Sequence, residues 1–265
     1  LQRLEKRVGA KLVARTSQGS QLTPAGAAFE QRMRVLTRDA EDATQEARDL
    51  SGGQVGQLRV GATPAASVFA LNALLPTLQL ERPAATMSVV NAFDHALIDG
   101  LIRQDIELAV CPLPDTLAPG LDSELLLEDS YCLVLNASHP LSVHREVPLA
   151  ALASCSWVSS PKNEFARQQT ELAFERAGLG IPRVLVEVNS LPALLAAIAN
   201  TQLVSLINSR GILPGKLPNS VVIRPLSKIV IPCPIGMVWR KRYVSSIAQR
   251  AMQLLRVAAD REPLL

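Results

Sequence analysis

The chain has 265 residues, of which 48% are hydrophobic and 19% charged, a composition typical of a folded globular protein. No apolar run reaches the roughly 20 residues that a membrane-spanning helix needs, and no basic-then-apolar leader opens the chain. We therefore expect a cytoplasmic protein with no membrane partner. Aromatic residues make up 3%, so Ala, Leu and Val must fill the core, which favours helices packed on parallel strands.

Charge is distributed unevenly along the chain. Residues 1–34 contain seven Lys or Arg and two Glu, a net charge of +5, so the remaining residues carry −2 of the total of +3. A basic end on a nearly neutral body predicts contact between that end and a polyanion.

The spacing of cysteine and histidine indicates neither a metal site nor a disulfide framework. The chain has no Cys-x-x-Cys pair, and its three histidines lack the spacing of metal ligands. We expect no metal, no cofactor, and buried free thiols in a reducing compartment at Cys111, Cys132, Cys155 and Cys233.

The chain begins with a short basic module. Apolar residues recur at helical spacing over residues 1–12, and the polar stretch 14–21 predicts a tight turn. Thr23 then suits the N-cap, and Pro24 the first position, of a second helix. Together these features predict a wing beside a nucleic-acid-reading helix; the alternative is an ordinary surface hairpin.

The second helix has the most regular periodicity in the sequence. Its apolar residues alternate at spacings of four and three over three heptads, a narrow seam typical of two long helices that pack together. The alternative is a helix that lies on its own domain. We expect the helix to end at a flexible joint, Ser51-Gly52-Gly53, and the seam to be formed by Phe29, Met33, Leu36, Ala40, Ala43, Ala47 and Leu50.

From residue 58 onward, strands and helices alternate. This rhythm predicts two βα sets, hence two α/β lobes with a small-molecule cleft at the carboxyl ends of the strands. The expected strands are 58–61, 86–91, 106–111, 156–158, 183–188, 203–207 and 235–239. The expected helices are 63–81, 94–103, 163–177, 190–199 and about 243–259.

Three strand-to-helix junctions share one pattern, a hydroxyl residue near an N-cap followed by proline in the first turn. They lie at residues 62–64, 159–163 and 189–192. A helix N-terminus presents free backbone N–H groups and favours anions, although the same residues also serve as plain caps. The catalytic motifs GxSxG, GxGxxG, Walker A and HExxH are missing, so we expect no enzyme activity.

The N-terminal residues resemble the signature of the LysR-type transcriptional regulators. The segments that match are Leu4–Arg15, with Val8 and Val13 as mild departures, and Leu22–Gly26. The body is also similar to this family at residues 56–61, 105–110 and 138–141, so the resemblance spans essentially the whole chain.

The resemblance implies a mixed α/β architecture with a two-lobed effector domain like the type 2 periplasmic binding proteins. A partial winged helix-turn-helix would occupy residues 1–22, and a linker and dimerisation helix residues 23–52. Lobe I would comprise 57–128 and 233–265, and lobe II 129–232. Because most of the reading helix of such proteins would precede Leu1, we expect an N-terminally truncated member that binds DNA weakly and with little sequence preference.

The implied partners are DNA, a small anionic or polar effector, and a second copy of the chain in a homodimer or homotetramer. The alternative is a solute-binding or small enzymatic α/β protein with an incidental helical N-terminus. The expected DNA contacts are Arg3, Arg7, Arg15, Ser17 and Gln18. The expected effector contacts are Thr63, Ser67, Asn91, Phe93, Ser159, Ser160, Asn189 and Ser190.

Overall fold

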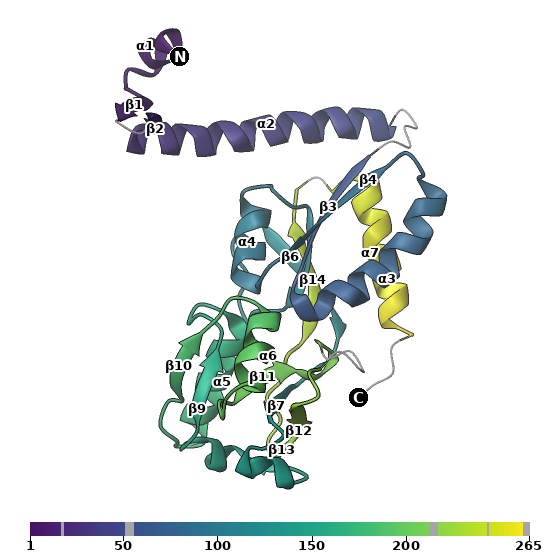
Figure 1. The fold of residues 1–265 in the computed structure, drawn as a ribbon. Helices are drawn as coiled ribbons and strands as arrows, with labels where there is room; N and C mark the ends of the chain where they lie inside the picture. Colours follow the sequence, from purple (N-terminus) through teal and green to yellow (C-terminus); the bar gives the residue numbers. More distant parts are fainter. Residues whose placement is uncertain (17–18, 51–55, 212–216, 243, 262–265) are drawn as a thin grey trace.

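The computed structural model describes residues 1–16, 19–50, 56–211, 217–242 and 244–261, without the side chains of residues 16, 45, 46, 48–50 and 211. Figure 1 shows a small N-terminal head, one long helix, and a body of two α/β units. Within the described residues, no helix combines the length and the apolar character needed to cross a membrane.

The head consists of one short helix and a hairpin. Helix α1 (Gln2–Val8) ends earlier than the spacing over residues 1–12 predicts, because Gly9 adopts a left-handed conformation with φ of 75° and its N–H bonds to the carbonyl of Glu5. The predicted hairpin is confirmed: β1 (Val13–Thr16) pairs antiparallel with β2 (Gly19–Leu22). Ser17 and Gln18 lie outside the described residues.

The long helix α2 (Pro24–Leu50) has 27 residues and therefore spans about 40 Å. It begins as predicted, because the Thr23 hydroxyl oxygen accepts a hydrogen bond from the Gly26 amide at 3.0 Å. The predicted joint at residues 51–53 lies outside the described residues.

Lobe I is our name for the unit built on the five-stranded sheet, whose strand order is β4-β3-β5-β14-β6. β3 runs parallel to β4 and β5, whereas β14 is antiparallel to β5 and β6. Successive residues of β5 alternate between two apolar clusters: one contains residues of α3 and α7, the other residues of α4. The bounds are β3 (Gln57–Ala62), α3 (Pro64–Glu81), β4 (Thr86–Asn91), α4 (Asp94–Ile102), β5 (Leu108–Pro112), β6 (Leu121–Leu127), β14 (Ile235–Arg240) and α7 (Ser246–Ala259).

Lobe II is our name for the unit between β6 and β14. It contains an antiparallel sheet of order β11-β7-β12 and a parallel pair of β9 and β10, with a parallel bridge between Trp157 and Val204. The bounds are β7 (Tyr131–Asn136), β8 (Val147–Pro148), β9 (Ser156–Ser159), α5 (Phe165–Arg176), β10 (Arg183–Glu187), α6 (Leu191–Ala199), β11 (Ser205–Asn208), β12 (Val221–Arg224) and β13 (Leu226–Ser227). Three short 3₁₀ turns lie at Pro140–Val143, Leu149–Leu152 and Ser209–Gly211.

One predicted helix start is wrong. The junction at residues 159–163 does not open a helix, because a turn follows β9 and α5 begins only at Phe165, with Glu164 as its N-cap. Proline at position 161 therefore precedes the helix rather than occupying its first turn. The other two junctions are confirmed as N-caps, at Thr63 before α3 and at Ser190 before α6.

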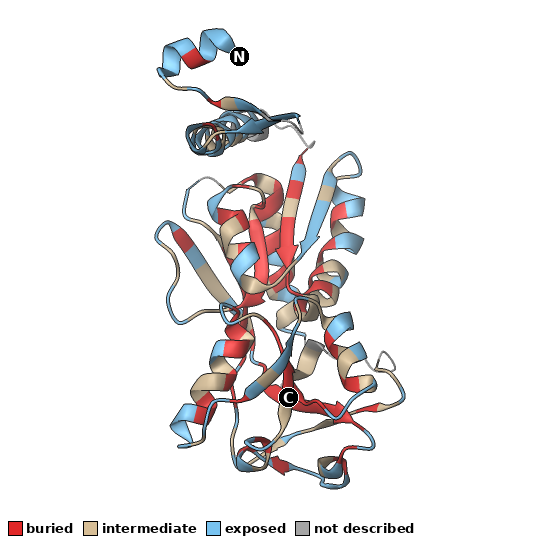
Figure 2. Cartoon of the chain, turned by 60° about the vertical axis from the view of Figure 1, so that its left-hand side comes forward, coloured by how far each residue is buried: buried red, intermediate tan, exposed pale blue. Residues whose placement is uncertain are grey.

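Two connections join the lobes and run side by side. The Tyr131 amide donates to the carbonyl of Ile231, and the Cys233 amide donates to the carbonyl of Asp129, each within 2.9 Å. Buried residues lie on the strands of both lobes (Figure 2), and one apolar cluster contains buried residues of both lobes, so their interiors are continuous. We call the two connections between the lobes the ribbon.

Candidate functional site

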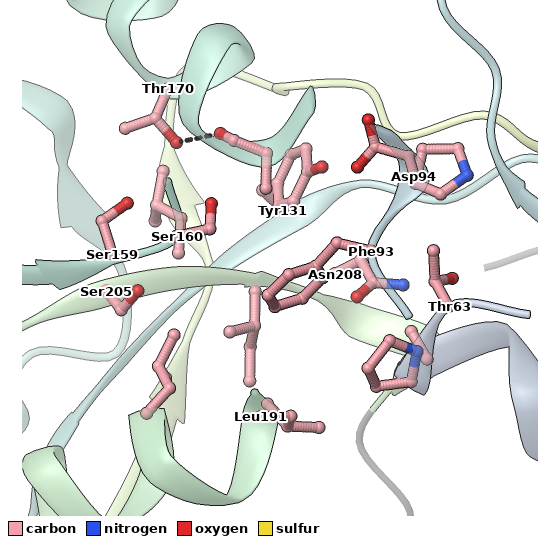
Figure 3. Close-up of a pocket in the computed structure, with 17 residues that line it drawn as sticks. Thr63, Phe93, Asp94, Tyr131, Ser159, Ser160, Thr170, Leu191, Ser205 and Asn208 are labelled. Atoms are coloured by element: carbon pink, nitrogen blue, oxygen red, sulfur yellow. Dashed lines mark hydrogen bonds between the residues drawn. The ribbon is translucent and has the colours of Figure 1, made fainter. Parts of the chain in front are cut away.

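A pocket of about 90 Å³ lies between the two lobes. Figure 3 shows Thr63, Phe93 and Asp94 from lobe I on one side, and Ser159 and Ser160 from lobe II on the other. The remaining lining residues are Pro64, Ala65, Pro112, Tyr131, Ala166, Thr170, Leu191, Leu194, Ser205, Leu206, Ile207 and Asn208.

Thr63 is the most informative residue of the lobe I wall. It occupies the N-cap of α3, yet its hydroxyl makes no capping bond; the Ala66 and Ser67 amides donate to its backbone carbonyl instead. The residue is 5% exposed, and its hydroxyl oxygen is buried without a hydrogen-bond partner. A buried hydroxyl without a partner is costly, which suggests that the pocket supplies a partner when it is occupied.

Tyr131 lies where the chain enters lobe II from lobe I. Burial raises the pKa of its hydroxyl well above the usual value, so the group stays protonated, and it is hydrogen-bonded to the Cys233 side chain. With the hydroxyls of Ser159, Ser160 and Thr170, the pocket offers several neutral polar groups on an otherwise apolar lining.

Asp94 is the acidic residue among the described lining residues, and neither Lys nor Arg occurs among them. Its carboxylate oxygens accept a hydrogen bond from the Phe165 amide, the first residue of α5 in the opposite lobe, at 3.2 and 3.4 Å. The pocket wall thus contains a direct link between the lobes.

Asn208 connects the pocket to the ribbon. Its side-chain amide donates to Asp129 at 3.1 Å, and the same carboxylate accepts from the Ser209 hydroxyl and the Arg210 amide. Asp129 is 6% exposed, and these bonds fix the start of lobe II against the end of β11.

The structure brings four of the eight expected effector residues together at the pocket: Thr63, Phe93, Ser159 and Ser160. The other four lie outside its lining. Ser67 is buried with its hydroxyl bonded to the Pro64 carbonyl, Asn91 and Asn189 are exposed, and Ser190 is half-buried beside the lining residue Leu191.

Several lining residues were not predicted from the sequence. Asp94 could have been found, because it directly follows Phe93 at a strand-to-helix junction. No local signal marks the four residues that the fold brings to the pocket from β7, α5 and β11: Tyr131, Thr170, Ser205 and Asn208.

The basic head and the α2 seam are both accessible. Arg3, Arg7 and Arg15 are exposed. Of the seam residues whose side chains are described, Met33 and Leu36 are 42% and 58% exposed, Ala40, Ala43 and Ala47 are exposed, and Phe29 is half-buried. The side chain of Leu50 lies outside the described part of the chain.

A stripe of α2 at the flank of the seam faces lobe I. Asp42 lies 3.3 Å from an Arg240 guanidinium nitrogen and 3.9 Å from one of Arg59, and Asp39 accepts a hydrogen bond from Gln104 at 2.8 Å. The helix therefore touches its own lobe through acidic residues and leaves its apolar seam uncovered.

A pocket lined by both lobes, at the ends of strands and helices, places the chain in the class of two-lobed small-molecule-binding modules. In the described residues, no group of three or more His, Cys, Asp or Glu side chains is arranged to hold a metal ion.

The family described as LysR substrate binding domain matches residues 51–260. The chain is 26% identical over 261 residues to the HTH-type transcriptional regulator GbpR of Azospirillum brasilense, covering 97% of this chain and 76% of GbpR. The chain belongs to the LysR family of transcriptional regulators.

Solved structures show the same fold. The structure of full-length CbnR complexed with its target DNA matches with a TM-score of 0.72 at 21% identity, covering 97% of this chain and 87% of CbnR. The regulatory domain of CcmR from Synechocystis PCC6803, in complex with 2-PG, matches with a TM-score of 0.70 at 18% identity, covering 78% of this chain and 99% of that one.

Proposed function

We propose that the pocket between lobes I and II binds the effector of this regulator, with Thr63, Phe93, Ser159 and Ser160 among its contacts. The observation that carries the proposal is the buried, unpartnered hydroxyl of Thr63 at the N-cap of α3. The related CcmR regulatory domain is known with the small ligand 2-PG, which supports a small molecule as the occupant. Ser67, Asn91, Asn189 and Ser190 stay predictions.

The lining favours a small polar effector with an apolar part. Hydroxyls and one amide alternate with apolar side chains, and Asp94 would repel an anionic group placed beside it. An effector carboxylate would be best placed at the N-termini of α3 and α6, where free backbone amides attract negative charge.

We propose that binding shifts the population of lobe arrangements, and that α2 transmits the change to the DNA-binding head. Exposed Arg3, Arg7 and Arg15 would contact phosphates, and Ser17 and Gln18 remain predicted wing contacts. CbnR, which shares this fold, is known bound to its target DNA. The seam of α2 would pair two copies of the chain. Lobe I would comprise residues 57–128 and 233–265, and lobe II residues 129–232.

We infer that the chain regulates rather than catalyses, and acts in the cytoplasm where DNA is accessible. Family membership supports both points, because the relatives that match are transcriptional regulators.

The effector site is tested by ligand binding to the variant Thr63→Val. Small carboxylic acids and polyols are screened by thermal shift, and the affinity of each binder is measured by calorimetry. Loss of one hydrogen bond of about 1 kcal/mol predicts a roughly fivefold weaker affinity in the variant. Thr86→Val, at the start of β4, is the matched control. If the ligands bind Thr63→Val with the same affinity as wild type, the effector site lies elsewhere.

A further inference from the structure

Two helix N-termini from opposite lobes cap one another beside the pocket. Asp94, the first residue of α4, accepts a hydrogen bond from the Phe165 amide at the start of α5 at 3.2 Å. Glu164, the N-cap of α5, accepts in turn from the His95 amide of α4 at 3.5 Å. Each carboxyl group thus occupies the partially positive end of the other lobe's helix. We call this pair of reciprocal contacts the clasp.

The clasp places the half-buried Asp94 carboxyl group against the buried carboxyl group of Glu164. Glu164 is 6% exposed. Burial, together with the hydrogen bond and the negative charge of Asp94, raises the pKa of Glu164 to about 8. Two neighbouring carboxylates cannot both ionise cheaply, so near neutral pH the pair shares one proton.

The groups around the clasp come from each element packed against it. On α4, the His95 ring lies 3.7 Å from Asp99. On α5, Arg167 is paired with Glu171, and Lys162 is exposed in the preceding turn.

From the strands and the ribbon, Cys111, Tyr131 and Cys233 also sense the charge of Asp94. Burial raises the pKa of all three, so they remain neutral near pH 7. None of them supplies a positive charge that would neutralise a doubly ionised clasp.

We propose that the Asp94–Glu164 clasp makes closure of the two lobes over the pocket a proton-linked step, so that the closed arrangement holds one proton that the open arrangement releases. The proposal rests on the proposed function, because it concerns regulation of the same pocket. Asp94 lines that pocket, so an effector that donates a hydrogen bond to Asp94 competes with the shared proton.

The direction of the pH effect follows from the raised pKa. Once the lobes separate, Glu164 becomes solvated and titrates near its ordinary value of 4.5. The bound proton therefore favours closure fully below about pH 4.5. As the pH rises, the equilibrium constant for closure falls by up to about tenfold per pH unit. Above about pH 8 the proton no longer contributes to closure.

The test measures closure at the clasp itself, without effector or DNA. The hydrogen-exchange protection factor of the Phe165 amide, corrected for the intrinsic exchange rate, is followed by NMR from pH 5 to pH 8 in the full chain. We expect it to fall at least tenfold in wild type and to stay within twofold in Glu164→Gln, whose neutral amide imitates the protonated acid. The Ala173 amide, inside α5, reports whether the helix itself remains folded.

Controls separate the clasp from other titrating groups. His95→Gln keeps the backbone amide that Glu164 uses, and Glu175→Gln removes an exposed carboxylate of α5; both should retain the wild-type pH dependence. If Glu164→Gln changes the protection of the Ala173 amide, Asp94→Asn is used instead. In that variant the protection factor of the Phe165 amide should fall by less in total, and the fall should be complete at a lower pH.

Three results would each overturn the proposal. They are a protection factor of the Phe165 amide that does not depend on pH in wild type, the wild-type pH dependence in Glu164→Gln, and loss of that dependence in His95→Gln. Because no ligand is present, failure here is distinct from failure of the effector site, which the affinity of Thr63→Val reports.

Discussion

At the scale of single residues, the pocket contains a position where stability and binding oppose one another. Thr63 buries a hydroxyl that has no hydrogen-bond partner, while its backbone performs the helix cap. A group of this kind lowers the stability of the empty protein and is useful only when a ligand satisfies it.

We therefore predict that Thr63→Val raises the stability of the ligand-free protein by about 1 kcal/mol, since an apolar group of similar shape replaces an unsatisfied one. The measurement is the midpoint of urea unfolding at unchanged m-value. Thr170→Val is the control, because its hydroxyl donates to the Ala166 carbonyl at 2.7 Å and its loss should lower stability. A lower midpoint for Thr63→Val would show that this hydroxyl is already satisfied.

The residue scale also shows what the sequence could and could not predict. Gly26 was recognised as part of a motif, and the structure gives its physical reason: a Cβ atom there would lie 1.9 Å from the Leu12 carbonyl oxygen. Thr63 and Phe93 were predicted because they lie at strand-to-helix junctions. Asn208 was not predicted, because nothing in its local sequence reveals that Asp129 lies beside it.

At the scale of elements, periodicity predicts most helices and strands, whereas some of their ends differ in the structure. α1 ends early at a left-handed glycine, and α5 begins late because Glu164, not Ser160, is its cap. The long seam of α2 was predicted, but its contact with lobe I was not. That contact depends on Arg240, almost two hundred residues away in the sequence.

The acidic stripe of α2 gives a prediction at this scale. Asp42→Ala removes the acceptor that faces Arg240 and Arg59, and we expect α2 to separate from lobe I at a cost of about 1–3 kcal/mol in docking free energy. Hydrogen exchange measured by mass spectrometry should become faster over residues 35–44 and 100–107 together.

The matched control for this docking is Glu41→Ala on the same helix. Glu41 pairs with Arg38 of α2 at 2.9 Å, so its loss should leave the hydrogen-exchange rates of residues 35–44 and 100–107 unchanged. Equal exchange in Asp42→Ala and wild type would mean that other contacts hold the helix.

At the scale of the whole molecule, α2 has two faces with different tasks. One stripe holds lobe I through charged groups, and the apolar seam beside it remains exposed in a single copy. An uncovered seam at heptad spacing favours a second copy as its partner.

We predict that Ala43→Asp dissociates the oligomer. Placing an unpaired carboxylate in a helix–helix seam costs roughly 3 kcal/mol, so the dissociation constant should rise about 100-fold. Sedimentation equilibrium gives this constant. Gln31→Asp adds the same charge on the face opposite the seam and should leave it unchanged. A wild-type monomer, or equal behaviour of the two variants, would contradict dimerisation through α2.

The position of β14 within the sheet of lobe I has a consequence for how the chain is made. β14 pairs with β5 and β6, so the strand that joins them is synthesised more than a hundred residues after them. During synthesis of lobe II, the edges of β5 and β6 that later pair with β14 remain unpaired. Lobe II, whose strands are contiguous in the chain, can fold first, and lobe I becomes complete only when residues 235–240 leave the exit tunnel.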